Sequence, residues 1–241
     1  MTPVVLVHGF MGGSRQWRDL QGAFHHDTHV LSVDLPGFGE NANLDAPSSI
    51  PGFAGWVIDR LSSEGIDSFH LLGHSMGGMI AQEIATAAPE RVDRLILYGT
   101  GATGVLPGRF ETIEVSKQRA HIDGPRDTAR RIAATWFLEN EHAPAFEECA
   151  AIAERSKMQA ICAGLDAMQS WSGVSNLPAI KATTLVVWGD HDRTYPWQQI
   201  EQLWTNIDDS SLAVIPKCAH AAHLEKPEIF GRIVQDFLTA Y

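Results

Sequence analysis

The stretch LLGHSMGGMI, residues 71–80, decides the fold of this 241-residue chain. It passes from a short apolar run into a helical pattern, and Ser75 stands at the junction between Gly73 and Gly77. A G-x-S-x-G sequence at a strand-to-helix turn holds its serine in a strained conformation, so that the hydroxyl projects clear of the sheet edge. The stretch therefore predicts a strand, a sharp turn that carries a candidate nucleophile, and a helix.

The rest of the chain repeats this alternation of strand and helix. Near-continuous apolar runs, typical of strands that are covered on both faces, occupy residues 3–9, 29–37, 69–75, 94–100, 184–190 and 211–217. Amphipathic helical patterns separate most of them. Strands that alternate with helices predict an α/β fold with a doubly wound, mostly parallel sheet of about six strands.

The alternation breaks once, after the fourth expected strand. From about residue 101 to residue 178 no good strand pattern occurs, and the apolar residues have helical spacing. We interpret this segment as a helical insertion over the carboxyl edge of the sheet. The sequence thus predicts an α/β core, residues 1–101 and 179–241, and a helical cap, residues 102–178.

Composition narrows the possible functions. A formal net charge of -11 argues against a nucleic-acid partner or an anionic membrane surface, which both require clustered basic residues. No apolar run is long enough to span a membrane. The N-terminal sequence predicts a strand and not a signal peptide, and the three cysteines suggest no disulfide framework, so we expect a cytoplasmic protein.

A serine hydroxyl is a weak nucleophile at neutral pH, and it needs a general base that a carboxylate orients. The sequence VVWGDHDRTYP, residues 186–196, offers Asp190 and Asp192 after the fifth expected strand. The sequence IPKCAHAAHLEKP, residues 215–227, offers His220 and His223 after the sixth. The residues alone leave both choices open. All four lie where the carboxyl ends of parallel strands place an active site.

Taken together, these motifs resemble the α/β-hydrolase superfamily over nearly the whole chain. The matching elements are the H-G-x loop at residues 8–10, the D-x-P-G-x-G turn at 34–39, the serine turn at 73–78, G-x-x-D at 189–192 and H-x4-E-x-P at 220–227. The resemblance implies a triad of Ser75, Asp192 and His220. It also implies an oxyanion hole formed by the backbone N–H groups of Phe10 and Met76, with no cofactor and no metal ion.

Two features depart from the family pattern. Ala219 stands where the family usually has a glycine before its histidine. The sequence begins almost at the H-G-x strand, so we expect it to lack the family's first two strands. The resemblance therefore implies an α/β-hydrolase fold with about six strands. Neither departure changes a residue of the expected triad.

The resemblance implies a serine hydrolase that cleaves a small-molecule carboxylic ester or lactone through an acyl-enzyme intermediate. Family members that react through an aspartate nucleophile are excluded, because the position holds Ser75. Carbon–carbon hydrolases of the family usually have H-G-x-G-P-G at the first loop, which HGFMGG lacks.

Two alternatives remain open. The sequences HGFMGGSRQW, VDLPGFG and HAAHLEKP also resemble the synthase that forms 2-succinyl-6-hydroxy-2,4-cyclohexadiene-1-carboxylate in menaquinone biosynthesis. That synthase usually has tyrosine and arginine where this chain has His74 and Met79. The second alternative is a non-catalytic receptor on the same fold.

Substrate specificity is expected on the insertion and on nearby loops. The residues predicted to line an apolar pocket are Met11, Trp136, Phe137, Trp171 and Trp197. Arginines of the insertion offer sites for a substrate carboxylate, although a solvated helix surface also explains such residues. These arginines are Arg109, Arg119, Arg126, Arg130, Arg131 and Arg155.

Overall fold

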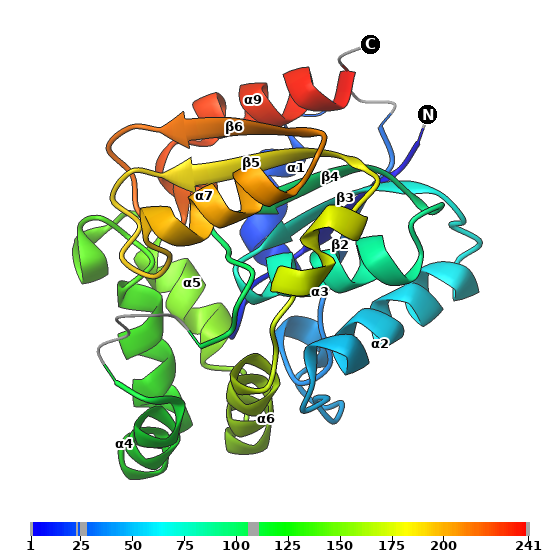
Figure 1. Cartoon of the computed structure of the whole chain (residues 1–241). Coiled ribbons are helices and arrows are strands. Elements are labelled where there is room, and N and C mark those ends of the chain that lie inside the picture. The colour runs from blue at the N-terminus through cyan, green and yellow to red at the C-terminus, as the bar shows by residue number, and fades with distance from the viewer. Residues whose placement is uncertain (1, 23, 25–27, 106–110, 240–241) are drawn as a thin grey trace.

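The computed structural model describes residues 2–22, 24, 28–105 and 111–239 (Figure 1). Within these residues, one six-stranded sheet has the order β2-β1-β3-β4-β5-β6, and every neighbouring pair is parallel. The strands are β1 (Val4–Val7), β2 (Val30–Val33), β3 (Phe69–His74), β4 (Val92–Tyr98), β5 (Thr183–Gly189) and β6 (Ser210–Ile215). The predicted fold class and sheet are confirmed.

Helices cover both faces of the sheet, which explains the continuously apolar sequence of its central strands. On one face, Trp17 and Phe230 belong to an apolar cluster with Leu6 and Tyr98. The larger cluster lies on the opposite face. The covering helices are α1 (Arg18–Gln21) and α9 (Pro227–Thr239) on the first face, and α2 (Ile50–Ser63), α3 (Met76–Ala87) and α7 (Trp197–Asn206) on the second.

The register of the central strands brings their carboxyl ends to one edge. Val7 of β1 pairs with Gly73 of β3, and His74 of β3 pairs with Tyr98 of β4. The loop after β1 and the turn after β3 therefore leave the sheet side by side. Such an edge is where open parallel sheets place their ligands.

Between β4 and β5 the described residues are mainly helical. They form α4 (Ile113–Ala134), α5 (Phe146–Ala153) and α6 (Met158–Gln169), with the short 3-10 helices η3 (Asn140–His142) and η4 (Val174–Ala179). Figure 1 shows α4, α5 and α6 grouped at one end of the sheet. A bridge between Thr103 and Ser172 joins the two ends of this segment. The exact division into core and cap stays a prediction.

A kink divides α4 into two helical pieces. Gly124 has a φ of 79°, a left-handed conformation that favours glycine, and Pro125 follows it. Proline is well suited to the first turn of a helix, so the second piece begins there. The kink changes the direction of the helix, and one face of the second piece lines the cavity described below.

The remaining elements are η1 (Ser14–Trp17), η2 (Gly39–Asn41) and α8 (Ala222–Glu225). Across the described ranges, none of the helices combines the length and the apolar character that crossing a membrane would require.

Candidate active site

Ser75 has the strained backbone that its motif predicts. Its φ of 56° and ψ of -121° are unusual for a residue with a side chain. Four hydrogen bonds hold this conformation: the Ser75 N–H donates to the Tyr98 carbonyl, while the Ser75 carbonyl accepts from Thr100 Oγ1 and from the N–H groups of Gly78 and Met79. The backbone of β4 and the first turn of α3 thus fix the serine.

The glycines of the motif are required by close packing. A side chain on Gly73 would collide with the backbone of Gly77, and one on Gly77 would collide with the carbonyl oxygens of Val7 and His8. A Cβ on Gly9 would lie 2.9 Å from the Cβ of Ser75. The strand, the turn and the first loop approach one another too closely for any larger residue.

Asp192 and His220 form a buried pair. Nδ1 of His220 lies 2.9 Å from Oδ2 of Asp192, and the two side chains are 2% and 0% exposed. The other carboxylate oxygen of Asp192 accepts hydrogen bonds from the backbone N–H groups of Thr194 and Tyr195. The carboxylate is therefore fixed in orientation, and it can hold the imidazole with its proton on Nδ1.

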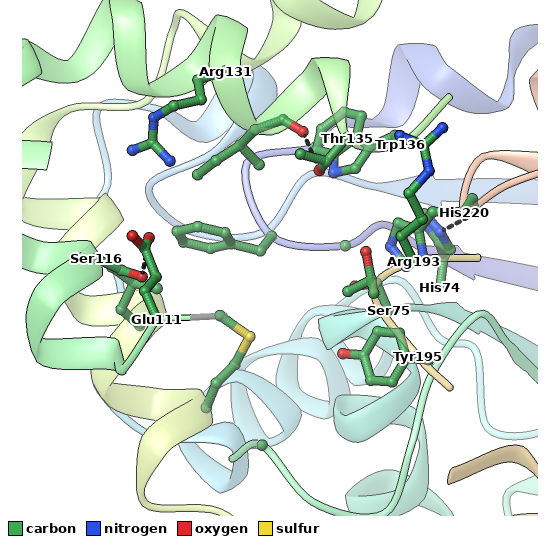
Figure 2. Close-up of a pocket in the computed structure, with 18 of the residues that line it drawn as sticks. His74, Ser75, Glu111, Ser116, Arg131, Thr135, Trp136, Arg193, Tyr195 and His220 are labelled. Carbon is green, nitrogen blue, oxygen red and sulfur yellow. Dashed lines mark hydrogen bonds between the residues drawn. The ribbon is translucent and has the colours of Figure 1, made fainter. Parts of the chain in front are cut away.

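Ser75 and His220 face the same cavity, whose volume is about 640 Å³. Figure 2 shows the hydroxyl of Ser75 beside the imidazole of His220, with His74 next to them. Because Nδ1 of His220 is used by Asp192, Nε2 is the nitrogen available to the serine. A hydroxyl, an imidazole and a buried carboxylate in this order can support nucleophilic catalysis.

The contacts in the structure distinguish Asp190 from Asp192 as the candidate acid, and His220 from His223 as the candidate base. Asp190 is bound elsewhere, because its Oδ1 lies 2.6 Å from Nδ1 of His191 and accepts from the backbone N–H of Lys217. His223 lies 3.2 Å from the hydroxyl of Tyr98, and it is not among the residues that line the cavity. The geometry therefore favours Asp192 and His220.

The loop after β1 is braced from within the protein. His8 donates from Nδ1 to the carbonyl of Gly9 and accepts at Nε2 from the N–H of Leu35. Burial lowers the pKa of His8, which keeps it neutral and able to accept. Gly9 and Phe10 line the cavity beside Ser75. Met76 is the first residue of α3, so its N–H has no intrahelical partner.

The loop that carries His220 is held on several sides. The Glu225 carboxylate accepts from the N–H of Ala219 and from that of Leu138, both at 2.6 Å. The N–H of Ala221 donates to the carbonyl of Trp136. The acidic residue of the H-x4-E-x-P motif thus links the histidine loop to the segment that follows α4.

The predicted pocket needs correction. Trp136 lines the cavity, but Met11, Phe137, Trp171 and Trp197 are not among its lining residues. Met11 and Phe137 are fully buried in the apolar core. The indole N–H of Trp171 donates to Glu83, and Trp197 packs against Trp188. These four side chains therefore contribute to packing within the protein and not to the cavity lining.

Residues of the second piece of α4 and its C-terminal end, most of them polar, line the cavity where most of the predicted apolar residues do not. Thr128 and Arg131 of α4, and Thr135, the residue that caps its C-terminus, line the cavity together with the apolar Ile132, and their spacing puts all four on one helical face. Of these residues, Arg131 was among the six arginines predicted from the sequence as possible sites for a substrate carboxylate, whereas Thr128 and Thr135 were not predicted. A helical spacing of hydroxyl and guanidinium groups was the signal that could have found them.

Arg131 differs from the other arginines that the sequence offered. It lines the cavity, whereas Arg119, Arg126, Arg130 and Arg155 do not. These four form ion pairs with Glu111 and Asp123, with Glu154, with Glu147 and Glu154, and with Glu40, respectively. Arg109 lies outside the described residues.

The fold, the strained serine turn and the buried acid–histidine pair define an α/β hydrolase. The model of the alpha/beta hydrolase family matches residues 4–232, and the chain belongs to that family.

Relatives with different reactions resemble the chain to a similar extent. It is 29% identical over 243 residues to RutD of Pseudomonas savastanoi pv. phaseolicola, a proposed carbamate hydrolase, covering 98% of this chain and 93% of that one. It is 29% identical over 260 residues to 2-hydroxy-6-oxononadienedioate/2-hydroxy-6-oxononatrienedioate hydrolase 1 of Pseudomonas putida, covering 98% and 87%. A thermophilic esterase structure from Thermogutta terrifontis superposes with a TM-score of 0.89 and 26% identity, covering 99% and 89%.

Proposed function

We propose that the protein is a serine hydrolase of small carboxylic esters or lactones, with Ser75, His220 and Asp192 as its catalytic residues. The observation that carries this proposal is the buried pair of His220 and Asp192 facing the strained Ser75 across one cavity. A turn used only for structure would not need an oriented imidazole beside its serine. The esterase among the similar structures supports the ester as substrate.

The reaction begins when Oγ of Ser75 attacks the substrate carbonyl and its proton passes to Nε2 of His220. The carbonyl oxygen becomes an oxyanion, which accepts hydrogen bonds from the backbone N–H groups of Phe10 and Met76. One such donor typically contributes ~3 kcal/mol of transition-state stabilisation. As the intermediate collapses, the bond to the alkoxide breaks and His220 returns the proton to that alkoxide.

Hydrolysis of the acyl-enzyme reverses these roles. Water attacks the ester of Ser75 while His220 takes a proton from it, and the same proton then returns to the serine oxygen as the acid leaves. Asp192 keeps the imidazole oriented and stabilises its cationic form in both steps.

The neighbouring histidines do not add a second positive charge. Burial is the main cause that lowers the pKa of His74 well below its ordinary value, and the charge of His220 lowers it further. Burial likewise lowers the pKa of His223 to about 3. His220 is therefore surrounded by neutral rings when it becomes an imidazolium.

A fluorophosphonate probe tests the nucleophile. We expect the probe to label the wild-type protein and to leave Ser75→Ala unlabelled, with the thermal unfolding of the two proteins closely similar. Absence of labelling in the wild-type protein would contradict the proposal and favour a non-catalytic receptor. Labelling that persists in Ser75→Ala would place the reactive serine elsewhere.

A substrate panel tests the reaction class. It combines p-nitrophenyl esters of graded acyl length and a lactone with a carbamate and with a 2-hydroxy-6-oxo-dienoic acid, the groups named for the relatives. Release of acid from an ester or lactone supports the proposal. If only the carbamate or the dienoic acid is cleaved, the ester assignment fails. Pyruvate release from the precursor of 2-succinyl-6-hydroxy-2,4-cyclohexadiene-1-carboxylate would instead support the synthase alternative.

A further inference from the structure

Polar side chains gather at the end of the cavity that lies away from Ser75. Figure 2 shows Glu111, Ser116 and Arg131 across the cavity from the serine and from His220. Thr128 lines the same cavity and lies one helical turn before Arg131. We call Glu111, Ser116, Thr128 and Arg131 the distal cluster. None of the four takes part in the proposed reaction.

Thr128 carries an unused hydroxyl. The residue is 1% exposed, and its Oγ1 has no hydrogen-bond partner within the described ranges. A threonine in a helix can usually bond its hydroxyl to a carbonyl of the preceding turn, as Thr135 does with Ile132. A buried polar atom without a partner destabilises the free protein. A ligand group that reaches this end of the cavity would provide the missing bond.

Arg131 presents a guanidinium group to the same space. Its one ion pair among the described residues joins Nε to Asp123 at 3.4 Å, and Nε makes no hydrogen bond there. For the part of the chain that the structure describes, no hydrogen bond is recorded for its two terminal nitrogens either. In that part of the chain, only Nε of this guanidinium has a partner, and that contact is long. The two terminal nitrogens therefore remain available as a pair of donors, the arrangement that suits a carboxylate.

Glu111 is the acidic member of the cluster, and it would repel a bound anion. However, its carboxylate already accepts a hydrogen bond of 2.7 Å from Ser116 Oγ, and Arg119 lies 3.6 Å from its other oxygen. Glu111 is thus partly neutralised by its own neighbours. The terminal nitrogens of Arg131 and the Thr128 hydroxyl remain for a ligand.

We propose that the distal cluster binds a carboxylate at the far end of the substrate, through Arg131 and Thr128. This inference rests on the proposed function, because it assumes that the reacting carbonyl lies at Ser75. The substrate class is then an ester or lactone whose acyl portion carries a second, free carboxyl group. A purely apolar acyl chain would leave the Thr128 hydroxyl and the terminal nitrogens of Arg131 without hydrogen-bond partners within the described residues.

The kinetic test uses matched esters. The mono-p-nitrophenyl esters of succinate, glutarate and adipate are compared with the same esters whose free carboxyl is capped as a methyl ester. The wild-type protein should have a higher kcat/KM for at least one free acid than for its capped form. Thr128→Val and Arg131→Gln should each lower that preference, the ratio of kcat/KM for the free acid to kcat/KM for its capped form, about tenfold or more.

We expect Thr128→Val to fold as the wild-type protein does, and Arg126→Gln supplies a matched control. Thr128→Val keeps the shape of the side chain and removes a hydroxyl that bonds nothing within the described chain, so thermal unfolding should not suffer. Arg126→Gln is the matched control on the same helical piece, because Arg126 is 77% exposed at its side chain and does not line the cavity. It should retain the wild-type preference.

Direct binding separates this inference from the proposed function. Calorimetric titration with succinate, glutarate and adipate should show binding to the wild-type protein and weaker binding to Arg131→Gln and Thr128→Val, whether or not esters are hydrolysed. The inference is overturned if the two variants keep the wild-type preference and dicarboxylate binding. It is also overturned if an acyl chain that ends in an amine is preferred, since Glu111 would then be the recognising group.

Discussion

The hydroxyl of Tyr98 lies 2.8 Å from the backbone carbonyl of His220. Nε2 of His74 lies 3.0 Å from the same oxygen, and because a carbonyl only accepts, His74 carries its proton on Nε2. Two donors from the ends of β3 and β4 therefore hold the backbone of the candidate base. Burial raises the pKa of Tyr98 well above its ordinary value, so its hydroxyl stays a donor.

This arrangement predicts that Tyr98→Phe slows catalysis more than it weakens substrate binding. The change leaves the His220 carbonyl with one donor and removes the acceptor used by the N–H of His223. We expect kcat to fall while KM changes little, with a loss of about 1–3 kcal/mol in the free energy of unfolding. Ester kinetics and urea unfolding measure the two effects.

Phe230→Leu serves as its control, since the ring of Phe230 packs against the ring of Tyr98 with 4.6 Å between the centroids, and a phenyl side chain has no hydrogen-bonding group. It should lower stability without a comparable loss of kcat. Equal losses of kcat in the two variants would show that Tyr98 acts through the packing of its ring and not through its hydroxyl.

Substitution of the buried carboxylate distinguishes the two acids of the loop after β5. Asp192→Asn should lower kcat by about 10⁴-fold, the loss known for the equivalent change in a serine protease. Asp190→Asn is the matched control, because its carboxylate contacts His191 and Lys217 and not His220. Steady-state ester kinetics measure both. A larger loss in Asp190→Asn than in Asp192→Asn would reverse the assignment of the acid.

The sequence predicted the sheet well, because its signals are local. Short continuous apolar runs, and the glycines around Ser75, report on neighbours only a few residues away. The H-G-x and D-x-P-G-x-G motifs can also be recognised locally, but the contact between the two motifs joins residues that are distant in the sequence. The bond from the Leu35 N–H to His8, which joins the two loops, follows from the register of β1 and β2 and could be seen only in the structure.

The pocket was predicted poorly for a related reason. Helical periodicity shows which residues share a face, but not which face meets the cavity. In the second piece of α4, Ala129 and Ala133 are buried in the core while Thr128 and Arg131 face the substrate space. The kink at Gly124 sets this rotation, and an apolar pattern alone does not reveal it.

The close packing of the serine turn predicts a contrast between two glycines. Gly77→Ala places a Cβ against the carbonyl oxygens of Val7 and His8, so the turn must deform. The free energy of unfolding should fall by about 3 kcal/mol or more. Gly55→Ala on α2 meets nothing within 4 Å and should stabilise the protein by roughly 0.5–1 kcal/mol. Thermal unfolding compares them. A harmless Gly77→Ala would show that the turn is looser than its contacts indicate.

Buried neutral histidines predict a loss of stability in acid. Burial lowers the pKa of His8 and of His74, and it lowers that of His223 to about 3. An unfolded histidine has a pKa of about 6.5. As pH falls below that value, the unfolded chain binds protons that the folded protein does not, so folding becomes less favourable. For His223, the loss runs from about pH 6.5 down to about pH 3.

Each such histidine should contribute up to about 1.4 kcal/mol of lost stability per pH unit within its window. Urea unfolding at several pH values between about 8 and 5 measures the slope. His223→Gln should reduce it, whereas His142→Gln, at an exposed position, should leave it unchanged. If His223→Gln keeps the full wild-type slope, then the folded protein binds a proton at residue 223 as readily as the unfolded chain does. The neutral surroundings that we propose for the His220 imidazolium would then be incorrect.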